Sequence, residues 1–176
     1  MAHHYTWDKL VKNSSRLNPK VRGVNYPYTP NFETIMIIPY MGTKSCLVKL
    51  QAWGVTQSRN LHQVTLLFND CEILTGEQEV SLWQYFKVEY QGQTYYVKKF
   101  DKLRNPLTHR CTCADFFYSW AWGNYYNGKC LYGPPPKPYR RKTNWMPPRN
   151  PGSIIGVCKH IYNAWDYLKR QGLTLN

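Results

Sequence analysis

The chain has 176 residues, of which 43% are hydrophobic and 16% aromatic, and its formal net charge is +13. This composition excludes an intrinsically disordered chain and allows one domain with a core or two small ones. No apolar run approaches the ~20 residues that span a bilayer, so we expect no membrane contact. The charge indicates an acidic partner, either nucleic acid, an anionic surface or a protein.

The N-terminal region is polar and irregular. Its first residues have no apolar core of the secretory type and include Asp8, so we expect no signal peptide and no secretion. The six cysteines should then stay reduced. Residues 24–32 carry two prolines and two tyrosines, a composition that suits an extended arm docked on a neighbour. We therefore assign residues 1–33 to an extended N-terminal arm.

Residues 34–92 form a predicted antiparallel β-sheet region. The segments TIMIIPY, SCLVKLQAW and HQVTLLF are rich in β-branched and aromatic residues and are separated by turn signals. YFKVEY and TYYVKKF flank the QGQ stretch at residues 91–93 and predict a hairpin. These strands are enough for a small antiparallel sheet or a barrel, and with the helices below they give an α+β fold.

The rest of the chain contains two predicted helices and a long loop. ADFFYSWAWGNYYNG, from residue 114, predicts a short helix that Gly128 can end. The insert at residues 129–152 is rich in proline and arginine and predicts an extended, polyproline-like loop. CKHIYNAWDYLKRQG predicts a helix with Ile161, Ala164, Trp165 and Leu168 on one apolar face.

Two cysteine-containing pairs point to a metal site. Cys111 and Cys113 lie too close in sequence for a relaxed disulfide, but two thiolates on one turn can bind a metal ion. Cys158 and His160 can supply the other two ligands, provided that Cys158 lies before the final helix, because residues two apart within a helix diverge by about 200°. Four protein ligands make a closed site, which indicates one structural zinc ion. Cys130 and His109 are alternative candidates for ligands of the ion. The alternative to a metal site is that these cysteines are ordinary buried residues that bind no metal.

The order Cys-x-Cys, long spacer, Cys-x-His, followed by an amphipathic helix and preceded by TYYVKKFDKL, resembles the SWIM-type zinc finger. The resemblance covers residues 94–170 and implies a zinc-stapled strand–strand–helix unit, which we place at residues 93–176 with the Pro-rich insert inside it. SWIM-type modules hold DNA or protein. The insert also resembles SWIM-like proteins of tailed bacteriophages, which implies a virion component of the capsid, neck, tail or baseplate.

Two functions therefore compete. We expect a non-enzymatic structural component that contacts other protein subunits of a large assembly, located in the virion and assembled in the bacterial cytoplasm. The alternative is a cytoplasmic nucleic-acid-binding protein that contacts DNA through the basic, aromatic insert, since no acidic residue lies between Phe116 and Trp165. In either case the candidate contact residues are Lys137, Tyr139, Arg140, Arg141, Lys142, Trp145 and Arg149.

An enzymatic function is the interpretation that the sequence supports least. The chain has no Gly-rich phosphate loop, and its Asp and Glu residues are scarce and scattered. Cys158 and His160 could form a nucleophile pair, but metal ligation uses them better. We expect no small-molecule substrate.

Overall fold

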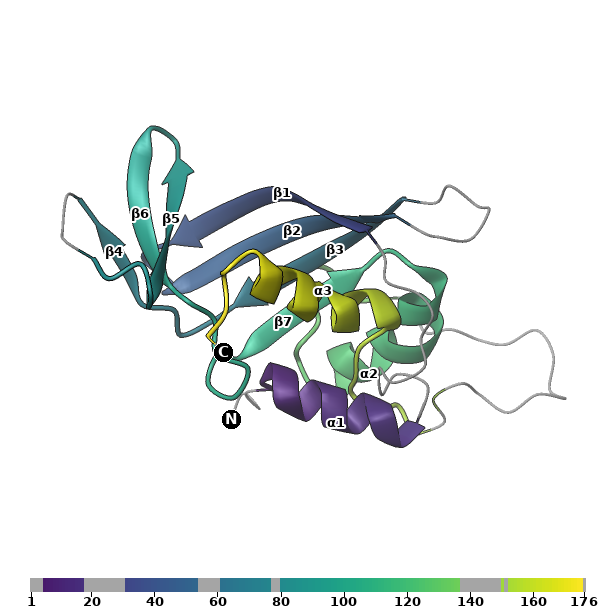
Figure 1. Ribbon diagram of the computed structural model, residues 1–176. Coiled ribbons are helices and arrows are strands. Elements are labelled where there is room, and N and C mark those ends of the chain that lie inside the picture. Colours follow the sequence, from purple (N-terminus) through teal and green to yellow (C-terminus); the bar gives the residue numbers. More distant parts are fainter. Residues whose placement is uncertain are drawn as a thin grey trace, which may run out of the picture.

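The computed structural model describes residues 5–17, 31–53, 61–76, 80–136, 150 and 152–175. Its helices are α1 (Trp7–Leu17), the π-helix η2 (Phe116–Trp120), α2 (Ala121–Tyr126) and α3 (Lys159–Arg170). Its strands are β1 (Asn31–Tyr40), β2 (Ser45–Trp53), β3 (Leu61–Phe68), β4 (Ile73–Thr75), β5 (Tyr85–Tyr90), β6 (Gln93–Lys98) and β7 (Leu107–Cys111). The fold is a mixture of helices and antiparallel sheets (Figure 1).

The strands form two open antiparallel sheets. The four-stranded sheet has the order β1-β2-β3-β7, and the three-stranded sheet has the order β4-β6-β5. Figure 1 shows the hairpin of β5 and β6 projecting from one end of the larger sheet. Of the two sequence alternatives, the described residues form sheets and no barrel, because β1 and β7 remain separate edges.

The predicted hairpin is confirmed. β5 pairs with β6 from Tyr85↔Lys98 to Tyr90↔Gln93, and only two residues connect the strands. Both of them, Gln91 and Gly92, have positive φ angles of 51° and 75°. Two such residues in succession make the type I′ turn, whose twist matches that of paired strands.

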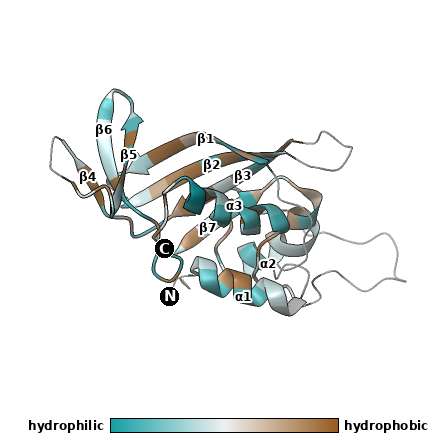
Figure 2. Cartoon of the chain, viewed as in Figure 1, coloured by the Kyte–Doolittle hydropathy of each residue, from teal (hydrophilic) through white to brown (hydrophobic). Residues whose placement is uncertain are grey.

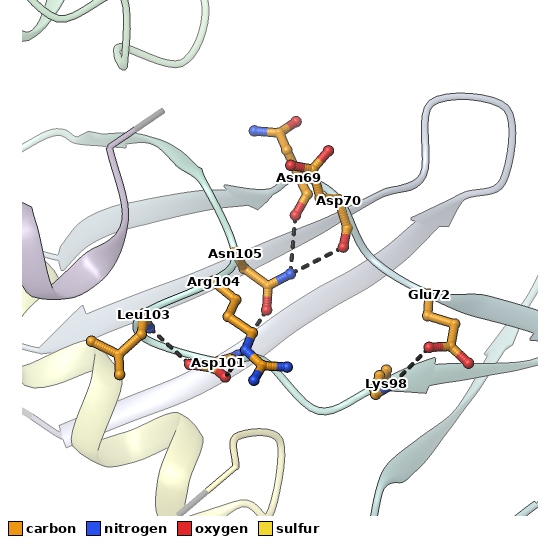
Figure 3. Close-up of polar contacts among 8 residues, drawn as sticks. All are labelled: Asn69, Asp70, Glu72, Lys98, Asp101, Leu103, Arg104 and Asn105. Atoms are coloured by element: carbon orange, nitrogen blue, oxygen red, sulfur yellow. Dashed lines mark hydrogen bonds and ion pairs between the residues drawn. The ribbon is translucent and has the colours of Figure 1, made fainter. Parts of the chain in front are cut away.

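The start of β7 is held by a polar loop that follows the three-stranded sheet (Figure 3). The Asn105 side chain donates hydrogen bonds to the carbonyl oxygens of Asn69 (3.0 Å) and Asp70 (3.3 Å), just after β3. Its Oδ1 accepts from the backbone N–H of Asp101 at 2.7 Å, and the Asp101 carboxylate accepts from Leu103 at 2.8 Å. This loop therefore directs the chain from one sheet back to the edge of the other.

The two strands of the predicted zinc unit belong to different sheets. The strand that precedes β7 in the sequence, β6, belongs to the three-stranded sheet. The partner of β7 is β3, in register from Val64↔Cys111 to Phe68↔Leu107. The polar loop separates β6 from β7, so that a distant strand, and not a neighbouring one, supports the Cys-x-Cys turn.

The extended N-terminal arm is also corrected, because part of it is the helix α1. Its apolar side is buried, with Trp7 6% and Leu10 0% exposed, and Trp7 stacks on Trp165 of α3 with ring centroids 5.1 Å apart. Asp8 lies in the first turn, where a carboxylate favours the helix dipole. Packing against α3 stabilises α1, whose polar sequence by itself did not predict a helix. Residues 18–30 lie outside the described part.

One hydrophobic core joins the sheets and α3. Phe68 of β3 stacks on Phe100 at 3.8 Å between ring centroids, and Phe100 contacts Phe86 of β5 edge-on at 5.3 Å. Trp165 of α3 lies 6.3 Å from Phe68. Figure 2 shows apolar residues along the larger sheet and hydrophilic residues interspersed along α3. The predicted apolar face of α3 is confirmed, since Ile161, Ala164, Trp165 and Leu168 are all buried.

Candidate metal centre

The Cys-x-Cys turn is placed by the last residue of β7 and the loop that follows it. Cys111 pairs with Val64 at the end of the β3–β7 ladder. The next residue, Thr112, is both a hydrogen-bond donor and an acceptor to Gln63 of β3. Its N–H donates to the Gln63 carbonyl at 3.0 Å, and its Oγ1 accepts from the Gln63 N–H at 2.9 Å. These two bonds fix the turn so that Cys111 and Cys113 are both buried.

The second pair lies at the start of α3, in the arrangement that the sequence requires. Cys158 is the residue before the helix and has an extended backbone, with φ −81° and ψ 170°. Its carbonyl accepts the first helical hydrogen bond, from the N–H of Tyr162 at 2.9 Å. His160 lies in the first turn of the helix. The change of backbone conformation at Cys158 lets two residues that are two apart turn toward the same point.

The four side chains meet in one buried cluster. One ligand atom each of Cys111, Cys113, Cys158 and His160 lies within 4.8 Å of the other three. The Cys111 Sγ and the His160 Nδ1 are 3.9 Å apart. In a tetrahedral zinc site with Zn–S of about 2.3 Å and Zn–N of about 2.0–2.1 Å, neighbouring ligand atoms are about 3.5–3.8 Å apart. The cluster could therefore hold one metal ion with little adjustment.

The electrostatics of the cluster also suit a cation. The pKa of Cys113 is lowered because the thiols of Cys111 and Cys158 donate to its sulfur. Burial is the main cause that raises the pKa values of Cys111 and Cys158. One thiolate is thus stabilised by two thiols that are costly to ionise in a buried place. A divalent cation supplies the positive charge that would ionise all three.

His62 is a neighbour of the cluster that the sequence did not reveal. Its ring lies against the ring of His160, with centroids 4.6 Å apart and an interplanar angle of 49°. Burial and then the charge of His160 lower the pKa of His62, which favours the neutral imidazole. The residue stands near the start of β3 with no motif spacing to Cys111 or His160, so only strand pairing could place it here.

The two rival ligands belong to a separate buried network. The Nε2 of His109 lies 3.2 Å from the Gly156 carbonyl oxygen and 3.0 Å from the Asn124 amide nitrogen. Burial lowers the pKa of His109 to about 4, so that it is neutral. The Cys130 thiol donates to the Asn124 carbonyl at 3.7 Å, and burial raises its pKa to about 12. Neither residue is in the ligand group found among the described residues.

The same network supports the segment that leads to Cys158. The Asn124 side chain binds both backbone groups of Gly156: it accepts from the N–H at 2.8 Å and donates to the carbonyl at 2.8 Å. The next N–H, of Val157, donates to the Oγ of Ser14 in α1 at 2.7 Å. Two segments far apart in the sequence, α1 and α2, thereby hold the backbone that leads to Cys158.

The insert carries the predicted contact residues. Lys137, Tyr139, Arg140, Arg141, Lys142, Trp145 and Arg149 lie outside the described residues. The described start of the insert is bound to β7, where Arg110 donates from Nε to the Tyr132 carbonyl at 2.6 Å and from Nη2 to the Pro134 carbonyl. Its end is bound through Asn150, which donates to the Ser119 carbonyl at 2.7 Å. Both ends are therefore attached to the unit that carries the metal cluster.

Comparison with known proteins finds no family model, no curated protein and no solved structure that matches this chain. Among the described residues, no helix has the length and apolar character that a membrane crossing requires.

Proposed function

We propose that this protein is a non-enzymatic structural subunit, stabilised by one zinc ion, that acts through contacts with other proteins in a large assembly. The observation that carries the proposal is the closed and buried character of the Cys3His cluster. Cys158 is 0%, His160 2%, Cys113 3% and Cys111 4% exposed. A metal with four protein ligands and no access for solvent has no open position for a substrate, as in structural zinc sites.

Zinc is the metal that fits the donor set. Thiolate and imidazole are soft and borderline ligands, and a Cys3His tetrahedron is one of the common structural zinc sites. The ion would join the end of β7 to the start of α3, on either side of the long insert. Its role would then be to hold the insert and η2 in place, since binding free energy at such a site acts as folding free energy.

The assembly we propose is a bacteriophage particle. The support for it comes from the sequence: the Cys-x-Cys and Cys-x-His order resembles the SWIM-type zinc finger, and the insert resembles SWIM-like proteins of tailed phages. The net charge of +13 and the high aromatic content suit a subunit with acidic neighbours.

Two measurements test this proposal. Elemental analysis of the purified native protein should give one zinc per chain, and mass spectrometry of purified particles of the source phage should find the chain at a fixed copy number. A chain that is made in infected cells but is absent from purified particles would contradict the structural role. Turnover that is lost in a folded, zinc-loaded His160 variant would contradict the non-enzymatic role.

Nucleic-acid binding is a second candidate because the segment from Phe116 to Trp165 has seven basic residues and no acidic one. Phosphate contacts release counterions, so such binding must weaken steeply with salt. Replacing Arg140, Arg141 and Lys142 with Ala separates the candidates. Lost DNA binding with intact incorporation into particles favours the nucleic-acid function, whereas unchanged DNA retention favours the structural one.

A further inference from the structure

The helical segment that follows the Cys-x-Cys turn carries aromatic residues on both of its sides. One side is buried in the core and consists of Phe116, Ser119, Trp120, Ala121, Gly123 and Asn124. The other side carries large aromatic residues that reach solvent: Phe117 is 46%, Tyr118 43%, Tyr125 39% and Tyr126 68% exposed, and Trp122 lies half-buried among them. We call these five outer residues the aromatic stripe. A group of large aromatic residues at the surface is typical of an interaction site.

The rings of the stripe contact one another in two groups. Phe117 and Tyr118 contact each other edge-on at 5.1 Å between ring centroids, one turn before Trp122. The Trp122 ring stacks on Tyr126 at 5.4 Å with an interplanar angle of 14°, and it lies 6.2 Å from Tyr125. The segment begins as the π-helix η2. This form is rare in proteins as a whole, and where it does occur it is often at a functional site. Rings ordered by one another lose little entropy on binding, which suits an interface.

The charge pattern indicates what covers the stripe. From Phe116 to Gly128 the chain has no charged side chain at all, and Lys129 is the next charge. Binding of nucleic acid needs cations beside the aromatic rings, to contact phosphates, and residues 116–128 supply none. Contact with an apolar protein surface needs no charge at its centre. The observations therefore favour a protein over a nucleic acid.

A second copy of this chain is a poor occupant. Each copy carries a net charge of +13, and no acidic residue lies between Phe116 and Trp165 to offset it, so two copies would repel each other. A different protein with an apolar groove and an acidic border would be attracted instead.

We propose that the aromatic stripe is the docking surface for a partner protein that offers an apolar groove bordered by carboxylates. This rests on the proposed structural function and names the part of the chain that makes the contact. Tyr126 and Phe117, the most exposed members, enter the groove as its anchors. The border carboxylates face Lys129 and the basic charge of the chain.

The metal cluster is hydrogen-bonded to the start of the aromatic stripe. The carbonyl oxygen of Cys113 accepts a hydrogen bond from the N–H of Phe117 at 3.1 Å, and the Sγ of Cys113 accepts one from the N–H of Phe116 at 3.3 Å. The first turn of the stripe is therefore hydrogen-bonded to a candidate ligand of the metal. Removal of the ion should release this turn and weaken docking together with folding.

The experiment uses the full zinc-loaded chain and a displayed library of random peptides. Peptides selected on the natural chain are tested against the variant Phe117→Ser/Tyr126→Ser and against Trp83→Ser, a matched control at an 84% exposed Trp in the turn before β5. Selected peptides should combine aromatic or aliphatic residues with Asp or Glu. They should bind the stripe variant at least about tenfold more weakly and bind the control unchanged, while zinc content and circular dichroism stay the same in all three proteins.

Other results would overturn the inference. Peptides that bind the stripe variant as well as the natural chain, or that are rich in Lys and Arg, exclude an acidic partner at the stripe. Oligothymidylate binding that is lost in the stripe variant would make it a base-stacking surface. A natural dimer that becomes a monomer in the variant would identify a second copy. If the stripe variant still enters particles, the docking surface is elsewhere although the structural function stands. If the natural chain is absent from particles, the proposed function itself fails.

Discussion

Gly156→Ala is the substitution for which the structure gives the sharpest expectation. A Cβ added at this position would lie 2.5 Å from the Cζ3 of Trp120 and 2.6 Å from the Oγ of Ser14. Neither atom can move away easily. Trp120 is a buried core ring, and the Ser14 hydroxyl is held by the Leu10 carbonyl at 2.8 Å and by the N–H of Val157 at 2.7 Å.

The cost follows from these contacts. Overpacking in a core costs about 1–3 kcal/mol. Retreat of the Gly156 backbone would also weaken its two hydrogen bonds to Asn124, each 2.8 Å long, at about 1 kcal/mol each. We expect the free energy of unfolding to fall by about 2–4 kcal/mol. For a chain of this length the melting temperature then falls by roughly 6–12 °C, taking about 3 kcal/mol as the central value.

Thermal unfolding followed by near-UV circular dichroism, with zinc in excess, measures this change. Gly42→Ala is the matched control, since nothing lies within 4 Å of its added Cβ. Because Gly156 is two residues before Cys158, competition with a coloured chelator should also show weaker zinc binding in Gly156→Ala alone. Equal melting temperatures for the two variants would refute the close packing of α1 and η2 around residue 156.

Three other variants test the metal centre and its support. Cys158→Ser removes a buried ligand, and we expect zinc to be lost and the free energy of unfolding to fall by about 4 kcal/mol or more; an unchanged melting temperature would show that the cluster binds no metal. His62→Ala should weaken zinc binding roughly tenfold, because it removes the ring that orients His160, and His62→Phe should restore it. Asn124→Ala leaves the buried N–H of Gly156 unpaired and leaves its carbonyl with the His109 Nε2 alone, at about 1–3 kcal/mol, whereas Asn127→Ala, at an exposed residue, should cost less than about 1 kcal/mol; equal costs would contradict the network.

Several features follow from the sequence alone because their causes are local. The two-residue turn of the β5–β6 hairpin is specified by Gln91 and Gly92, which accept positive φ angles. The apolar face of α3 follows from the helical period. The position of Cys158 before that helix follows from the need to turn Cys158 and His160 toward one point. The four candidate ligands could therefore be chosen from residue type and spacing.

Other features of the site depend on contacts between residues far apart in the sequence. No pattern near Cys111 says that its strand pairs with β3, because register between distant strands depends on which apolar faces bury each other. That pairing brings His62 to His160. The need for glycine at position 156 comes from the closeness of Trp120 and Ser14. Contacts across such separations depend on the packing of the whole core, which local preferences do not contain.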